Sequence, residues 1–96
     1  MNKRIGVVGV VIQNRIQNAP AVNDILSEFG DIIVGRLGVP RQKHDLSVIS
    51  LIVEGTPDQL GALTGRLGSL ADVDVKSGLT STEIPTQRRD NNVSTD

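Results

Sequence analysis

The sequence predicts a small α+β domain in which two helices cover one face of a four-stranded antiparallel sheet. Three observations support this prediction. Two segments, Arg4 to Ile12 and Leu46 to Glu54, are apolar on both faces, which is typical of central strands. Two other segments have the spacing and the end signals of helices. The remaining β-type segments are partly polar or contain glycine, as strands at the edges of a sheet often do.

The first predicted strand, Arg4 to Ile12, leads into a polar turn over residues 13–18. Asn18 is suited to cap a helix N-terminus, and Pro20 is tolerated in a first turn because its missing N–H needs no partner there. The next apolar residues recur at the spacing of one helix face: Val22, Ile25, Leu26 and Phe29. Because Gly30 is a common helix-ending residue, we expect the first helix over about residues 19–29.

The second strand is predicted over Asp31 to Pro40. This segment is rich in β-branched residues and contains two glycines, which are typical of a bulged or bent strand. A proline cannot donate to a sheet ladder, so Pro40 either ends this strand or confines it to an edge. The charged residues 41–45 are then expected to form a hairpin loop into the strand that begins at Leu46.

The second helix has the clearest start signal in the chain. Thr56 is the predicted N-cap, Pro57 takes the first helical position, and Gln59 completes a capping box. The predicted buried stripe consists of Leu60, Leu63, Leu67 and Leu70. Three glycines fall on a neighbouring arc of the same helix: Gly61, Gly65 and Gly68. Because each costs about 1 kcal/mol relative to alanine in a helix interior, we expect another backbone to approach closely there.

The last predicted strand covers residues 72–79, where valines alternate with charged residues as in an edge strand. From Thr80 onward the chain is polar and has almost no apolar anchor. We therefore expect a folded domain over residues 3–79 and a disordered tail over residues 80–96, docked at most loosely through Ile84.

The predicted order of strand, helix, strand, strand, helix, strand is the split arrangement of ferredoxin-like folds. Right-handed crossovers then place both helices on one face of the sheet. The other face, called the open face below, presents an apolar strip that a second copy of the chain could cover. We assign to it Ile5, Val7, Gly9, Val11, Val48, Ser50 and Ile52. The opposite assignment stays open, because both faces of the two central strands are apolar.

The composition argues against several classes of function. The chain has 96 residues, a net charge of −1 and no block of basic residues, so direct nucleic-acid binding is not expected. It has no cysteine and a single histidine, His44, so we predict neither a metal site nor a cofactor. The first residues lack the layout of a signal peptide, and no apolar stretch is long enough to span a bilayer. We expect a cytoplasmic protein that does not associate with membranes.

The best ligand candidate is the turn after the first strand. It joins a central strand to a helix N-terminus, whose N–H groups can bind a carboxylate, so Asn14, Arg15 and Asn18 are candidates for binding a small anionic metabolite. Helix capping is the simpler role for Asn18. A basic cluster could contact an acidic ligand or partner protein, or could simply be a solvated loop. Its members are Arg36, Arg41, Lys43 and His44.

Catalysis is not predicted. An acylphosphatase-like enzyme needs a glycine-rich cradle with an arginine after the first strand; Arg15 is present, but residues 13–16 contain no glycine. The glycines at 35 and 38 precede no helix, so they do not predict a phosphate loop. Ser47 and Ser50 lie within a strand, without a nucleophile elbow or a base at fixed spacing.

Five segments of the chain are similar to those of one family of small proteins. They are Lys3 to Val8, Asn23 to Leu26, Asp31 to Pro40, Ser47 to Val53 and Gly61 to Gly68. Together they resemble the proposed regulators of the iron-only hydrogenase system, over Lys3 to about Leu79. The resemblance implies a ferredoxin-like, ACT-like module that assembles into dimers or tetramers and is similar to the effector domain of nickel-responsive repressors.

Three departures limit what the resemblance implies. Nickel-responsive repressors bind metal through several histidines and a cysteine, whereas this chain has one histidine and no cysteine, so metal sensing is not carried over. Their DNA-binding segment is absent here, so control of transcription would act through a partner. The usual ACT loop has a glycine near the helix start where this chain has Ala19, Pro20 and Ala21, so amino-acid binding is not implied.

Two functions remain as hypotheses. The first is a non-enzymatic regulatory or sensor module that oligomerises through the open face and binds a small metabolite where subunits meet, with a link to iron-only hydrogenase regulation. The alternative is an accessory protein-interaction module for metalloenzyme assembly, with no ligand of its own.

Overall fold

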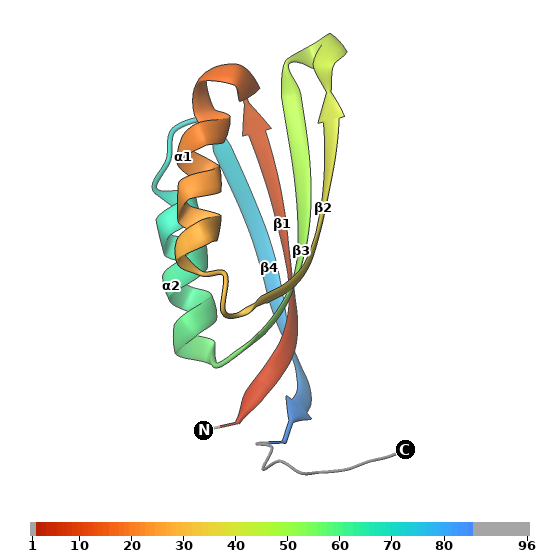
Figure 1. Ribbon diagram of the computed structural model, residues 1–96, viewed down its shortest axis with the longest axis vertical. Coiled ribbons are helices and arrows are strands. Elements are labelled where there is room, and N and C mark those ends of the chain that lie inside the picture. Colours follow the sequence, from red (N-terminus) through yellow and green to blue (C-terminus); the bar gives the residue numbers. More distant parts are fainter. Residues whose placement is uncertain (1, 86–96) are drawn as a thin grey trace.

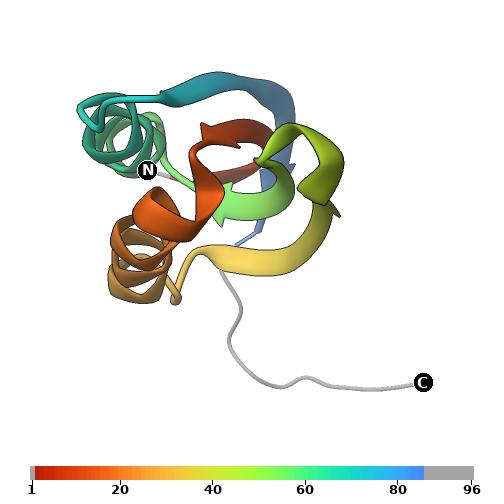
Figure 2. The same ribbon diagram turned by 90° about the horizontal axis from the view of Figure 1, so that it is seen from above.

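The computed structural model describes residues 2–85. The elements along the chain are β1 (Lys3–Gln13), α1 (Arg15–Glu28), β2 (Ile33–Arg41), the short 3-10 helix η1 (Gln42–His44), β3 (Leu46–Gly55), α2 (Pro57–Gly68) and β4 (Val73–Ile84). The strands form one antiparallel sheet in the order β2-β3-β1-β4. Both helices lie on one side of it, as Figures 1 and 2 show. The predicted ferredoxin-like α+β fold is confirmed.

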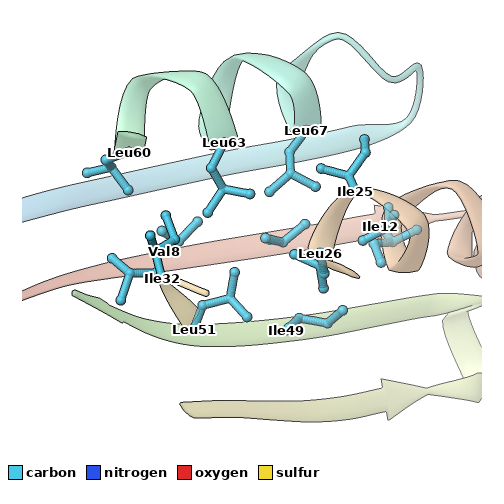
Figure 3. Close-up of a cluster of buried hydrophobic side chains, with 13 residues drawn as sticks. Val8, Ile12, Ile25, Leu26, Ile32, Ile49, Leu51, Leu60, Leu63 and Leu67 are labelled. Atoms are coloured by element: carbon cyan, nitrogen blue, oxygen red, sulfur yellow. The ribbon is translucent and has the colours of Figure 1, made fainter. Parts of the chain in front are cut away.

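The hydrophobic core fills the space between the helices and the sheet. Alternate residues of the two central strands point into it, because successive side chains of a strand face opposite sides. The core consists of Val8, Val10, Ile12, Val22, Ile25, Leu26, Ile32, Ile49, Leu51, Val53, Leu60, Leu63 and Leu67, shown as sticks in Figure 3. It contains no aromatic ring, since Phe29 is only partly buried at its edge. Each fully buried aliphatic side chain contributes about 1.5–3 kcal/mol relative to exposure.

Helix α1 begins earlier than its sequence predicts. It starts at Arg15, its N-cap is Asn14, and Pro20 lies inside the helix. Asn14 takes the left-handed conformation (φ 49°, ψ 57°), which asparagine tolerates better than most residues, and this turns the chain directly from β1 into the helix. Asn18 is therefore not the N-cap. Its amide instead donates to the carbonyl of Gln13 at 2.7 Å, which holds the first turn against the end of β1.

Helix α2 confirms its predicted start. The Thr56 hydroxyl accepts from the N–H of Gln59 at 3.2 Å, and the Gln59 side chain accepts from the N–H of Thr56 at 2.9 Å. The expectation for its glycines is wrong. Within residues 2–85, a Cβ added at Gly61, Gly65 or Gly68 would meet no heavy atom within 4 Å, so no other backbone approaches this arc of the helix.

Strand β4 is longer than predicted. It continues past Leu79 to Ile84, and Glu83 lies opposite Arg4 after an irregularity in the pairing with β1. The Thr80 hydroxyl donates to the carbonyl of Ile5 at 2.7 Å, so a polar segment is held by hydrogen bonds rather than by apolar contacts. The predicted tail is therefore wrong for residues 80–84. Its remaining part, residues 86–96, lies outside the described residues.

Candidate functional site

Three turns meet at one end of the sheet, at the top of Figure 1. Each contains a non-glycine residue in the left-handed conformation: Asn14 (φ 49°), Asp45 (φ 53°) and Asp72 (φ 65°). The N–H of Gln13 donates to the Asp72 carbonyl at 2.8 Å, and the Asn14 amide donates to the Asp72 carboxylate at 3.0 Å. The N–H of Arg15 reaches the Asp45 carbonyl at 3.3 Å. These bonds tie the start of α1 to both neighbouring turns.

A hollow of about 210 Å³ lies between the start of α1 and the β2–β3 hairpin loop, lined by Arg15, Ile16, Gln42 and Asp45. We call it the Arg15 hollow. Typical small-molecule sites occupy roughly 300–1,000 Å³, so this one suits a ligand of few heavy atoms. Its polar lining combines a guanidinium, an amide and a carboxylate with the first turn of a helix.

The Arg15 side chain carries the strongest chemical signal in this hollow. Its Nε is buried and has no hydrogen-bond partner within residues 2–85. The side chain of the N-cap, Asn14, makes no capping hydrogen bond to the helix. Because a buried unpaired donor is costly and the start of a helix favours negative charge, both features suit an anionic group at this position.

The structure separates the three predicted ligand residues. Arg15 lines the hollow, but the Asn14 side chain binds Asp72 and the Asn18 side chain binds the Gln13 carbonyl. Sequence reasoning did not assign Ile16, Gln42 and Asp45 to the site. Gln42 and Asp45 belong to a distant hairpin, so their approach depends on the tertiary fold. Ile16 is 81% exposed. It was not assigned to the site because the predicted turn over residues 13–18 is otherwise polar.

The predicted basic cluster is divided in two. Arg36 donates to the side chain of Asn23 at 3.0 Å and thus reaches toward α1 from the middle of β2. Arg41 ends β2, while Lys43 and His44 lie in η1, next to the Arg15 hollow. All of these side chains are exposed. The hairpin loop therefore adds positive charge near the hollow, and Arg36 does not.

The predicted open-face residues lie on the side of the sheet away from the helices. Val7, Val48 and Ile52 are 49%, 37% and 40% exposed, whereas Val8, Val10 and Leu51 on the opposite face are buried. In the pairing of β1 with β3, Val7 lies opposite Ile52, Gly9 opposite Ser50 and Val11 opposite Val48, while Ile5 continues the same side of β1. The contribution of β2 was missed: Leu37 and Val39 extend this face at 65% and 42% exposure.

Two further sequence expectations concern metals and membranes. Among residues 2–85, no group of three or more histidine, cysteine, aspartate or glutamate side chains is arranged to hold a metal ion. In the same part of the chain, no helix has the length and apolar character needed to cross a bilayer.

Comparison with known proteins identifies relatives of the chain. A family model described as "TM1266-like: Iron-only hydrogenase system regulator, putative" matches residues 4–77. The structure of the uncharacterized protein TM1266 from Thermotoga maritima is similar, with 31% identity and a TM-score of 0.77 over 80% of this chain and 96% of that one. Among curated proteins, none matches.

More distant solved structures share the fold. An unknown protein from Galdieria sulphuraria has 13% identity and a TM-score of 0.57, over 86% of this chain and 48% of that one. The apo form of CPII from Thiomonas intermedia K12, a nitrogen regulatory PII-like protein, has 15% identity and a TM-score of 0.50, over 84% of this chain and 94% of that one. At these identities the likeness shows the fold alone.

Proposed function

Because this chain belongs to the TM1266-like family of iron-only hydrogenase system regulators, we propose that it is a non-enzymatic regulatory module that binds a small anion and self-associates through its sheet. The anion is a small metabolite, and the regulated system is the one that the family description names. The observation that supports ligand binding is the unpaired, buried Nε of Arg15 in a hollow at the start of α1.

The chemistry of the Arg15 hollow favours a carboxylate or a phosphate. The Arg15 Nε–H supplies a donor, the N-terminal end of α1 supplies positive potential, and the Gln42 amide can add a second donor. Lys43 lies in the same hairpin and attracts negative charge to this end of the sheet. The Asp45 carboxylate repels an anion on its own side, so the ligand is expected to approach from Arg15 and Ile16.

A binding role suits the hollow better than a catalytic one. Its lining contains no serine, cysteine or lysine that could act as a nucleophile. Asp45 is its single carboxylate, and no imidazole lines it, so a pair of groups for general acid and base catalysis is missing among the lining residues.

Self-association is proposed from the open face, with Ile5, Val7, Gly9, Val11, Val48, Ser50 and Ile52 at the interface. Large exposed apolar side chains gathered on one face of a small domain mark an interaction site more often than they occur by chance. The hollow lies at the end of the same sheet, so in a dimer or tetramer a ligand there would sit close to the region where subunits meet.

One observation favours a second function. The open face is large and apolar while the hollow is small, which suits an accessory module that docks a protein partner and has no ligand of its own. In that case metalloenzyme assembly, rather than metabolite sensing, is the role.

Isothermal titration with inorganic phosphate and with succinate separates these functions. The wild type is expected to bind at least one of the two, and Arg15→Gln is expected to weaken binding about tenfold or more, because a charge-assisted hydrogen bond is lost. Arg36→Gln is the matched control, since Arg36 lies away from the hollow and should leave binding unchanged. If the wild type gives no heat signal with either probe, or if Arg15→Gln binds as tightly as the wild type, the sensor function is contradicted and the accessory function is favoured.

A further inference from the structure

We infer that the chain forms a closed, face-to-face pair in which the open face of one copy stacks on the same face of a second copy, centred on Gly9 and Ser50. This inference rests on the proposed self-association. It narrows that proposal from a dimer or tetramer to two copies, adds Leu37 and Val39 to the interface, and excludes both edges of the sheet.

The open face has raised apolar rows on either side of a low centre, a shape that can fit against a second copy of itself. Ile52 and Val7 form one apolar row across the sheet, and Val48 and Val11 form another. Between these rows lie Gly9 and Ser50, directly opposite each other, so the centre of the face is low. On β2, Leu37 lies opposite Ser50 and Val39 lies opposite Val48, so these two side chains extend the face toward its edge. Side chains of a second copy can therefore settle between the rows.

The size of the face suits a second copy. Four strands about 4.8 Å apart, with a rise of about 3.3 Å per residue over residues 5–13, give a face of roughly 19 Å by 26 Å. Two such faces bury on the order of 1,000 Å², which is about the minimum expected of a biological interface. Residues 86–96 contain one aliphatic side chain, Val93, so their composition makes them a poor cover for this face compared with a second copy.

Both edges of the sheet carry features that discourage strand pairing. On β2, Pro40 removes an N–H donor and the pairing with β3 shifts at Val34. On β4, Asp74 and Lys76 place charges on the open-face side, and the pairing with β1 becomes irregular after Leu79. Natural sheets use such devices to prevent edge-to-edge association. At the centre of the open face Gly9 and Ser50 carry no charge, and Lys76 lies opposite Gly9 on the edge strand β4.

The number of copies follows from the contrast between the protected edges of the sheet and its open face. When a surface pairs with the same surface of a second copy, both surfaces are fully occupied. No such surface then remains for a third copy, so the assembly closes at two. Growth to four copies would require an edge or the helical side. Asp74 and Lys76 lie next to each other on the same side of β4 and have opposite charges. The β4 rim of the open face therefore carries one negative and one positive side chain toward the second copy.

Gly9 offers a test that separates pairing from folding. A Cβ added there would meet only the Lys76 carbonyl oxygen, at the ordinary contact distance of 3.8 Å, and no glycine in the described residues has a positive φ. A larger side chain at this position therefore points into open space in one copy and into the partner in the pair. Gly38, on edge strand β2, also has no atom within 4 Å of an added Cβ and faces the other side of the sheet, so it is the matched control.

The experiment is sedimentation velocity on the full chain as wild type, Gly9→Arg and Gly38→Arg, with circular dichroism to confirm folding. We expect a wild-type dimer, an intact dimer for Gly38→Arg, and a folded Gly9→Arg monomer whose dissociation constant rises about a hundredfold or more, because a charge is buried without a partner. Ser50→Arg provides the same test at the opposing residue should Gly9→Arg fail to fold.

Each other outcome contradicts a specific step. A dimer that survives both Gly9→Arg and Ser50→Arg overturns the face-to-face arrangement but not self-association. Loss of the dimer in Gly38→Arg alone would move the contact to the edge. A wild-type tetramer overturns the closed pair, and a wild-type monomer at high concentration overturns the proposed self-association itself.

Discussion

Two glycines of β1 provide a paired test of the packing, because the same substitution is expected to have opposite effects on stability. Gly6 and Gly9 are three residues apart on one strand, and they face opposite sides of the sheet. A Cβ added at Gly6 would lie 2.9 Å from Leu79 Cδ1, 3.1 Å from the Gly78 carbonyl oxygen and 3.1 Å from Val53 Cγ2. At Gly9 the nearest atom is 3.8 Å away.

The magnitudes follow from these distances. At Gly6 the leucine methyl can rotate away, but a backbone oxygen and a buried valine must also move, and overpacking of this kind costs about 1–3 kcal/mol. At Gly9 the methyl group fits without strain, so Gly9→Ala should be neutral or should stabilise by about 0.4–1 kcal/mol through the unfolded chain. For a domain of this size, each kcal/mol changes the melting temperature by roughly 4–8 °C.

Urea unfolding of both variants, repeated over a range of protein concentrations, is the appropriate assay. The concentration series separates the stability of one copy from any effect of pairing through the open face. If Gly6→Ala unfolds at the same urea concentration as the wild type, the tight contact between β1 and β4 is wrong. If Gly9→Ala loses more stability than Gly6→Ala at low concentration, the assignment of the two faces is reversed.

Two further predictions concern the helical layer. Leu63→Ala should destabilise by about 2–5 kcal/mol in the same unfolding assay, because Leu63 is fully buried and its removal leaves a cavity between α2 and the sheet; a loss below 1 kcal/mol would contradict this packing. Thr56→Ala should reduce the free energy of unfolding by about 1 kcal/mol because it removes one half of the capping box, and Gln59→Ala should reduce it by a similar amount. The double variant should lose less than the sum of the two, and additive losses would show that the two caps act independently.

The parts of the fold that the sequence predicts well are those specified by local signals. The start of α2 depends on residues within one turn of each other, so Thr56 and Gln59 are sufficient to locate it. The doubly apolar strands also indicate their central position in the sheet, because a strand that is apolar on both faces is typical of a sheet interior covered on both sides. The element order that these features helped to predict is confirmed, whereas the sequence left open which face of the central strands the helices cover.

The start of α1 could not be predicted in the same way. Asn18 before Ala19 and Pro20 forms a plausible helix start, but the chain enters the helix at Arg15 because Asn14 adopts a left-handed conformation. That conformation is supported from another part of the chain, through the bond of the Asn14 side chain to Asp72. A contact between residues 58 positions apart leaves no local trace in the sequence.

The Arg15 hollow has the same origin. Sequence reasoning identified Arg15 from its position after a central strand, yet Gln42 and Asp45 reach it only because η1 folds back toward α1. Likewise, β4 extends to Ile84 because Thr80 bonds to the carbonyl of Ile5, which a polar composition does not indicate. In both cases contacts between segments far apart in the sequence, including the pairing of Glu83 with Arg4 and of Ile84 with Lys3, shape the local structure.

At each of the two candidate surfaces, one copy of the chain departs from the packing or hydrogen-bonding rules that its core follows. In the core, each buried apolar side chain has partners and the pattern of each strand agrees with its face. At the open face the pattern of Val7, Val48 and Ile52 is that of a buried strand, although these side chains are exposed. At the hollow, Arg15 keeps a buried donor unpaired. Both departures would be removed by a binding partner, apolar at the face and anionic at the hollow, and for this reason we place the proposed function at these two surfaces.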